Sequence, residues 1–188
     1  RTGSSFGHFR VSGACAPHLE GSPVITYPDL TPDAIRAAHD RLPAVFRHSP
    51  EYVHEGLSAS LGVPVVIKDE TANPIRSFKG RGTWIAVTNL AVAGAISTDR
   101  PVVCASAGNF GQGVAWAARS LRLPAVVYVA RRANPAKVAR MRALGADVVQ
   151  VDGDFDDART ASERHARDHE AHLLVDGDDT RISTGAAT

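Results

Sequence analysis

The sequence lacks long apolar runs, a set of cysteines that could form a disulfide framework, and an excess of charge of either sign. No apolar stretch approaches the about 18 to 20 residues that a membrane-spanning helix needs, and the first residues show no signal-peptide pattern. The two cysteines, Cys15 and Cys104, lie far apart, and 21 basic residues against 20 acidic residues give a formal net charge of +1. We therefore expect a protein of the reducing cytoplasm that binds neither a membrane nor nucleic acid.

The composition is otherwise that of an ordinary folded protein. The chain has 188 residues, of which 44% are hydrophobic and 22% are charged, enough for one sizeable domain or two small lobes. It begins at Arg1 without an initiator Met and stops at Thr188 in a run of Gly, Ala and Thr. We expect a fragment, or the ordered part, of a longer protein.

Helical and strand patterns alternate along most of the chain. Residues 1–30 mix Gly, Ser and Pro without apolar periodicity and predict an irregular arm. The patterns predict helices at residues 32–42, 55–62, 79–95, 111–121, 133–146 and 154–171, and strands at 63–70, 101–106, 124–130, 147–153 and 172–176. This alternation favours an α/β fold with βαβ units, a mostly parallel sheet and helices on both faces. Ligands of such sheets gather at the carboxyl ends of the strands.

One strand-to-helix loop ends in a lysine. It delivers Ser77, Phe78 and Lys79, with Gly80 and Gly82 directly after them. A helix N-terminus disfavours an ammonium ion, and burial acts in the same direction, so Lys79 could serve as a neutral, nucleophilic amine. The flanking glycines would let a planar ring approach the backbone closely. The alternative is a solvated lysine in the first turn of a helix.

A second strand-to-helix loop carries Ser106, Ala107, Gly108, Asn109 and Phe110. Free N–H groups at a helix start bind anions, and glycines let the anion come close, so a substrate carboxylate fits this loop. The side-chain amide of Asn109 could donate to a phenolate oxygen. Two alternatives stay open: a tight turn whose glycines serve only packing, and a nucleotide-binding turn, although the order GxxGxG differs from GxGxxG.

Both loops resemble segments of the fold-type II (tryptophan synthase β-like) pyridoxal-phosphate enzymes. NPIRSFKGRG (73–82) resembles their NPxxSFKxRG segment, and VPVVIKDE (63–70) matches the lead-in to it. SAGNFGQGVAWAAR (106–119) is similar to SAGNHAQGVA of the threonine and serine dehydratases, and its GVAWAA tail also resembles diaminopropionate ammonia-lyase. The resemblance runs over residues 49–188 and implies parallel sheets with flanking helices in a two-lobed architecture whose C-terminal part is missing.

The resemblance also implies a role for each residue of the two loops. Lys79 would hold pyridoxal 5'-phosphate as a Schiff base, and Phe78 and Asn109 would also contact the cofactor. The backbone of Ser106, Ala107, Gly108, Asn109 and Phe110 would bind the carboxylate of a small amino-acid substrate. The implied activity is that of a lyase: β-elimination (dehydratase or ammonia-lyase) from threonine, serine or diaminopropionate, with Lys79 removing the α-proton. The alternatives are β-replacement, as in cysteine synthases or threonine synthases, and a non-catalytic homologue or fragment.

Two positions depart from the family pattern. Phe110 stands where the family usually has histidine, which removes a polar side chain that we expect beside the substrate. Ala107 stands where the serine racemases carry a serine that exchanges a proton on the far face of the substrate. The second departure disfavours racemisation and leaves elimination open.

The resemblance divides the chain into lobes. Residues 1–100 would form an N-terminal arm and the part of the large lobe with the lysine loop, residues 101–170 a small α/β lobe, and residues 171–188 an incomplete return into the large lobe. The sequence contains no glycine-rich run for the cofactor phosphate and no evident partner for the pyridine nitrogen. We therefore expect these 188 residues to be incomplete as a catalyst, and a full-length homodimer.

No metal site is expected. His165, His169 and His172 have spacings that could gather a metal ion, but the dense charge around them favours a solvated helix face. The acidic segments at residues 152–157 and 176–179 lack the ligand spacing of a calcium loop, so they predict turns.

Overall fold

The computed structural model describes residues 30–188, so most of the predicted N-terminal arm and Cys15 lie outside the described part of the chain. The helices are α1 (Pro32–Asp40), α2 (Ala44–Arg47), α3 (Glu55–Leu61), α4 (Lys79–Val92), α5 (Asn109–Ser120), α6 (Pro135–Ala143), α7 (Phe155–Asp168) and α8 (Thr180–Ala186). The strands are β1 (Glu51–Val53), β2 (Val66–Lys68), β3 (Val102–Ala105), β4 (Ala125–Ala130), β5 (Asp147–Val151) and β6 (His172–Leu173). None of the helices within residues 30–188 is long and apolar enough to cross a membrane.

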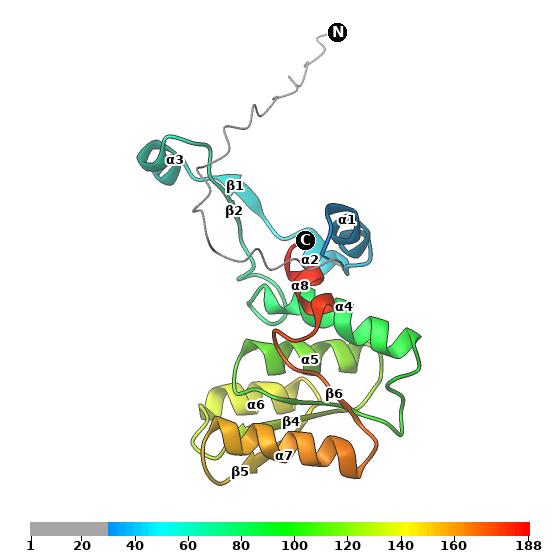
Figure 1. Ribbon diagram of the computed structural model, residues 1–188. Coiled ribbons are helices and arrows are strands. Elements are labelled where there is room, and N and C mark those ends of the chain that lie inside the picture. Colours follow the sequence, from blue (N-terminus) through cyan, green and yellow to red (C-terminus); the bar gives the residue numbers. More distant parts are fainter. Residues whose placement is uncertain (1–29) are drawn as a thin grey trace, which may run out of the picture.

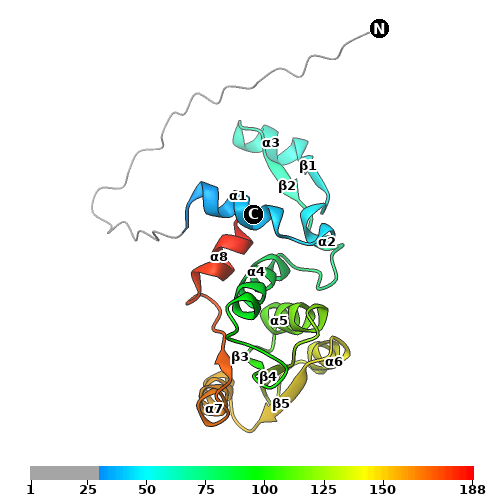
Figure 2. The ribbon, with the colours of Figure 1, turned by 90° about the vertical axis from the view of Figure 1, so that its right-hand side faces the viewer.

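Four strands form one parallel sheet in the order β5-β4-β3-β6. The central strands β3 and β4 are almost entirely buried, as expected for strands covered on both faces. The helices α5 and α6 cover one face, and α7 covers the other (Figure 1; Figure 2). The predicted α/β class, with a parallel sheet between flanking helices, is confirmed. The predicted division into lobes at residues 100 and 170 stays a prediction.

Three short elements, α2, β1 and α8, were not predicted from the sequence. The strand predicted at residues 63–70 forms β2, but it does not join the parallel sheet; it pairs antiparallel with β1. β1 has three residues and α2 has four, too few for an apolar period to stand out. Together with α3, these strands project from the main body (Figure 1).

Side-chain caps explain why several helices begin where the sequence predicts. The Thr31 hydroxyl accepts a hydrogen bond from the Ala34 amide (3.1 Å) at the start of α1. Asp154 forms a capping box with Asp157 at the start of α7, and Asp179 caps α8. The turns predicted at the two acidic segments lead into α7 and α8, whereas the caps Asp154 and Asp179 were not predicted.

The helices α4, α5 and α8 lie in close contact because glycines line their interfaces. A Cβ added to Gly113 in α5 would lie 2.5 Å from the Thr83 hydroxyl of α4, and one added to Gly185 in α8 would lie 2.6 Å from the Arg81 carbonyl oxygen. Such distances leave no room for a side chain. Trp84 and Trp116 are partly buried and pack against the core.

Candidate active site

Lys79 is the first residue of α4, and its amine points toward the carboxyl edge of the parallel sheet. Its Nζ lies 2.8 Å from both carboxylate oxygens of Asp176, which follows β6. The two side chains are 29% and 38% exposed, so the ion pair lies partly buried at the surface rather than in bulk water. Phe78 precedes the helix; its ring is half exposed, with the centroid 5.5 Å from Nζ.

Asn73 holds the lysine loop in shape. Its side-chain oxygen accepts hydrogen bonds from the amides of Ile75 (3.1 Å) and Ser77 (3.3 Å). Its side-chain nitrogen donates to the Ser77 carbonyl oxygen (3.0 Å) and to the Glu70 carboxylate (2.7 Å). A buried amide with four partners fixes the backbone that leads into Lys79.

A buried ion pair anchors the first turn of α4. The side chain of Arg81 is 2% exposed, and its Nη1 lies 2.8 Å from the carboxylate of Glu70. Arg81 also donates to the Phe46 carbonyl oxygen (2.6 Å) and to the Thr188 hydroxyl (2.8 Å). Because Glu70 also holds Asn73, one carboxylate connects the lysine loop with the helix that follows it. This network was not predicted from the sequence.

The second loop presents free amide groups at the carboxyl end of β3. The Ser106 hydroxyl accepts hydrogen bonds from the amides of Gly108 (3.2 Å) and Gly111 (3.1 Å). The amides of Ala107, Asn109 and Phe110 have no hydrogen-bond partner within residues 30–188. These three donors at the start of α5 suit an anionic group such as a carboxylate.

The side chain of Phe110 lies in the hydrophobic core and is 4% exposed. The expected role of Phe110, binding the substrate carboxylate through its backbone, stays a prediction. An aromatic ring suits this position because the side chain belongs to the main hydrophobic core. Ala107 lines a cavity of about 750 Å³ at the carboxyl ends of β4 and β5.

Asn109 is exposed and lines a separate cavity of about 480 Å³ together with Ile75 and Arg76 of the lysine loop. One turn into each helix, Thr83 and Gly113 lie against each other, so the first turns of α4 and α5 are neighbours. The structure therefore brings together the two loops that the sequence analysis singled out.

The pairing of β6 with β3 brings Asp176 near the same point. Val102 pairs with His172 and Val103 pairs with Leu173. Beyond β6, Asp176 lines a pocket together with Ala105, which is the last residue of β3 and directly precedes Ser106. The lysine amine and the free amides of the second loop thus lie at one edge of the sheet, where ligands of parallel sheets bind.

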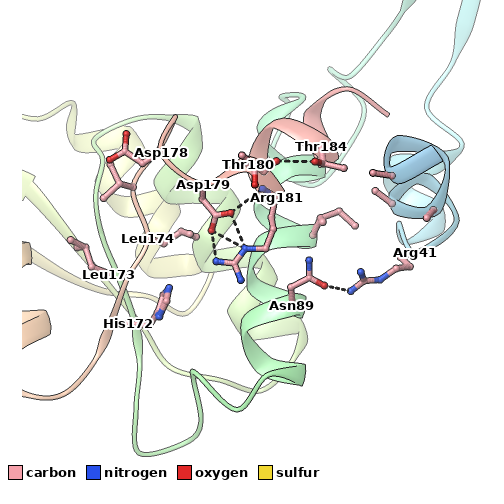
Figure 3. Close-up of a pocket in the computed structure, with 15 residues that line it drawn as sticks. Arg41, Asn89, His172, Leu173, Leu174, Asp178, Asp179, Thr180, Arg181 and Thr184 are labelled. Atoms are coloured by element: carbon pink, nitrogen blue, oxygen red, sulfur yellow. Dashed lines mark hydrogen bonds and ion pairs between the residues drawn. The ribbon is translucent and has the colours of Figure 1, made fainter. Parts of the chain in front are cut away.

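A further cavity, of about 800 Å³, lies elsewhere. It lies between α1, α4, β6 and α8, and it is lined by neither Lys79 nor the second loop. Figure 3 shows that Asp179 and Arg181 face each other there, 2.6 Å apart at closest approach, and that Arg41 donates to Asn89. Burial alone would raise the pKa of Asp179, but the hydrogen bonds from Arg181 outweigh it and lower that pKa. Because this cavity contains neither Lys79 nor the free amides of the second loop, we do not assign the active site to it.

The histidines do not gather around a common point for a metal ion. The Nδ1 atom of His165 lies 2.9 Å from the Tyr128 hydroxyl, and the rings of His165 and His169 are 4.5 Å apart. His172 lies on β6 and lines the large cavity instead. Across residues 30–188, no group of three or more His, Cys, Asp or Glu side chains could hold a metal ion.

Comparison with known proteins identifies the family. Residues 48–188 match the family described as "Pyridoxal-phosphate dependent enzyme". A mitochondrial threonine dehydratase of Schizosaccharomyces pombe is 32% identical over 162 residues, covering 86% of this chain and 26% of that protein. A threonine synthase of Mycobacterium leprae is 34% identical over 154 residues, covering 77% of this chain and 42% of that protein.

Among solved structures, the apo form of Escherichia coli diaminopropionate ammonia lyase superposes with a TM-score of 0.73 at 25% identity. The match covers 86% of this chain and 49% of that structure, so the chain spans half or less of the length of these relatives. The match favours the pyridoxal-phosphate interpretation of the second loop over a nucleotide-binding turn. Arg131, which lines a pocket together with Ala107 of that loop, is paired with Asp152 at 2.8 Å. The chain belongs to the pyridoxal-phosphate-dependent enzyme family.

Proposed function

We propose that the whole protein is a pyridoxal-phosphate-dependent ammonia-lyase that eliminates the β-substituent of a small amino acid such as threonine, serine or diaminopropionate. The observation that carries the proposal is the position of the Lys79 amine, on an anchored helix start beside a loop with three free amides. Two of the relatives, a threonine dehydratase and a diaminopropionate ammonia lyase, support elimination.

The residues present fit the cofactor. Lys79 supplies a partly exposed amine that could bond covalently to an aldehyde. Asn109 supplies an exposed amide for a ring hydroxyl, and the free amides of Ala107 and Phe110 suit the substrate carboxylate. Residues 30–188 contain no run of glycines that could enclose a phosphate dianion, so we assign phosphate binding to the rest of the whole protein.

The chemistry divides between the cofactor and the chain. When bound, pyridoxal phosphate supplies an electron sink for the negative charge that develops at the substrate Cα. The free amine of Lys79 accepts the α-proton. The amides of the second loop hold the substrate carboxylate, which keeps the Cα–H bond oriented toward that amine. The network of Asn73, Glu70 and Arg81 keeps the amine at a fixed point.

Replacement of Lys79 tests this proposal. In the full-length enzyme, Lys79→Ala should abolish both the visible absorbance of the covalently held cofactor and the release of keto acid and ammonia. The matched control is Lys68→Ala, because Lys68 lies on β2 and bonds to Ser49 and Glu51. The control should keep both signals. Persistence of both signals in Lys79→Ala would contradict the proposal.

A second candidate function is β-replacement, which the threonine synthase relative supports. The same lysine serves both reactions, so product analysis separates them. Keto acid and ammonia indicate elimination, whereas a new amino acid without ammonia release indicates replacement.

A cytoplasmic location and a homodimer belong to the same proposal. Cys104 is buried and unbonded, which suits a reducing compartment. Cell fractionation tests the location, and light scattering of the full-length protein tests the assembly.

A further inference from the structure

Asp176 is a carboxylate whose partner in this structure is the proposed catalytic amine. Both of its oxygens lie 2.8 Å from the Lys79 Nζ, and the side chain is 38% exposed. Its negative charge also reaches the neighbouring strand. The pKa of the Cys104 thiol on β3 is raised to about 12, first by burial and then by the charge of Asp176. Asp176 therefore acts electrostatically on the carboxyl edge of the sheet, where the proposed substrate site lies.

This ion pair cannot persist while Lys79 holds the cofactor covalently. Once the lysine nitrogen is committed to that bond, it no longer offers an ammonium with three donors to Asp176. The nearby arginines already have partners: Arg159 bonds to Glu163 at 3.0 Å, and Arg181 bonds to Asp179 at 2.6 Å. A partly buried carboxylate without a counter-charge is unfavourable, so the working site favours a ligand that brings a cation.

We propose that Asp176 determines specificity by binding a second ammonium group on the substrate, which makes a 2,3-diamino acid the preferred substrate class. This inference rests on the proposed function. Asp176 lines a pocket together with Ala105, the residue directly before Ser106, and the loop that begins at Ser106 offers the amides for the substrate carboxylate. A small amino acid can thus place its carboxylate on the amides and its β-ammonium on Asp176.

The charge of Asp176 also disfavours the other substrates. A β-hydroxyl group is uncharged, so its hydrogen bond to the Asp176 carboxylate is weaker than that of an ammonium group. An anionic substituent is repelled by the carboxylate. A β-ammonium is also suited to leave. When the Cβ–N bond breaks, the electron pair goes to nitrogen and neutral ammonia departs. The leaving group therefore needs no proton donor, and the only proton transfer is that of the α-proton to Lys79.

The test compares two substrates in the full-length holoenzyme. We expect Asp176→Asn to lower the ratio of kcat/KM for 2,3-diaminopropionate to kcat/KM for serine by about 10-fold or more, the effect of losing a charge-assisted hydrogen bond. The control is Asp178→Asn. Asp178 is exposed, and its substitution removes the same charge two residues away. The control should leave the ratio within about 2-fold, within the range expected for an exposed charge.

A binding measurement gives a readout without turnover. In the Lys79→Ala enzyme loaded with pyridoxal phosphate, titration with 2,3-diaminopropionate should shift the cofactor absorbance, and adding Asp176→Asn should weaken that binding about 10-fold. Asp176→Glu keeps the charge and should retain the preference for the diamino acid. This variant separates the loss of the charge from a folding defect caused by substitution at position 176.

The outcomes separate the two proposals. If serine yields keto acid and ammonia but the substrate ratio and the binding stay unchanged in Asp176→Asn, the inference about Asp176 is overturned and the proposed function stands. If no amino acid yields keto acid and ammonia in the wild-type holoenzyme, the proposed function fails and the inference fails with it.

Discussion

Removal of the Glu70 carboxylate should strongly destabilise the protein. Glu70 accepts hydrogen bonds from Arg81 (2.8 Å), Ser49 (2.8 Å) and Asn73 (2.7 Å). In Glu70→Ala the guanidinium of Arg81, which is 2% exposed, keeps its charge without a counter-ion. Breaking a buried pair in this way costs about 3 to 5 kcal/mol. This is a large share of the about 5 to 15 kcal/mol that keeps a typical domain folded.

Denaturant unfolding measures this cost directly. Trp84 in the affected helix α4 and Trp116 in the neighbouring helix α5 supply the fluorescence signal. Their ring centroids are 5.5 Å apart. The control is Glu51→Ala, which removes a 67% exposed carboxylate that lies 3.4 Å from Lys68. It should cost less than about 1 kcal/mol.

A conservative variant separates charge from shape. Glu70→Gln keeps the size of the side chain and can still accept a hydrogen bond, but it lacks the negative charge, so it should lie between the control and Glu70→Ala. A cost of Glu70→Ala no larger than that of Glu51→Ala would refute the reasoning that the buried pair anchors the first turn of α4.

Three further predictions follow from packing and burial. Gly113→Ala should lower the unfolding free energy by about 1 to 3 kcal/mol, because its Cβ would lie 2.5 Å from the Thr83 hydroxyl; an unfolding curve that matches wild type would contradict the close α4–α5 contact. In a Cys15→Ser background, Cys104 should react with a thiol reagent only after unfolding, because burial raises its pKa to about 12; fast reaction of the native protein would show that the thiol is accessible. Burial lowers the pKa of His165 from 6.5, so between the folded-state pKa and pH 6.5 the unfolded state binds more protons than the folded state. The stability present above pH 6.5 should therefore fall as the pH drops through the folded-state pKa. His165→Gln should reduce this pH dependence of the melting temperature, and an unchanged profile would count against the prediction.

The central sheet could be predicted from the sequence because its strands are continuous apolar runs. β3 and β4 are buried on both faces, so their side chains are apolar without interruption. The cap Thr31 marks a helix start locally, and so it could be recognised as well. The two loops of the candidate site were predicted because each follows a strand and begins a helix.

The remainder of the site depends on contacts between residues that are distant in sequence. Lys79 and Asp176 are 97 residues apart, and the pairing of β6 with β3 together with the packing of α8 on α4 brings the segment after β6 to the lysine. The sequence analysis interpreted the acidic segment at 176–179 as a turn, which is correct for its shape but says nothing of this ion pair. The burial of the Phe110 side chain could not be predicted for a related reason, since local sequence does not show which side of a helix start faces the core.

The most direct test of the account is reduction of the full-length protein with borohydride in the presence of pyridoxal phosphate, followed by peptide mapping. The 188 residues contain three lysines, Lys68, Lys79 and Lys137, so the attachment site can be assigned without ambiguity within this part of the chain. The account predicts that the reduced cofactor is found on the peptide that contains Lys79. Attachment to Lys68 or Lys137 instead, or no attachment to any of the three, would contradict it.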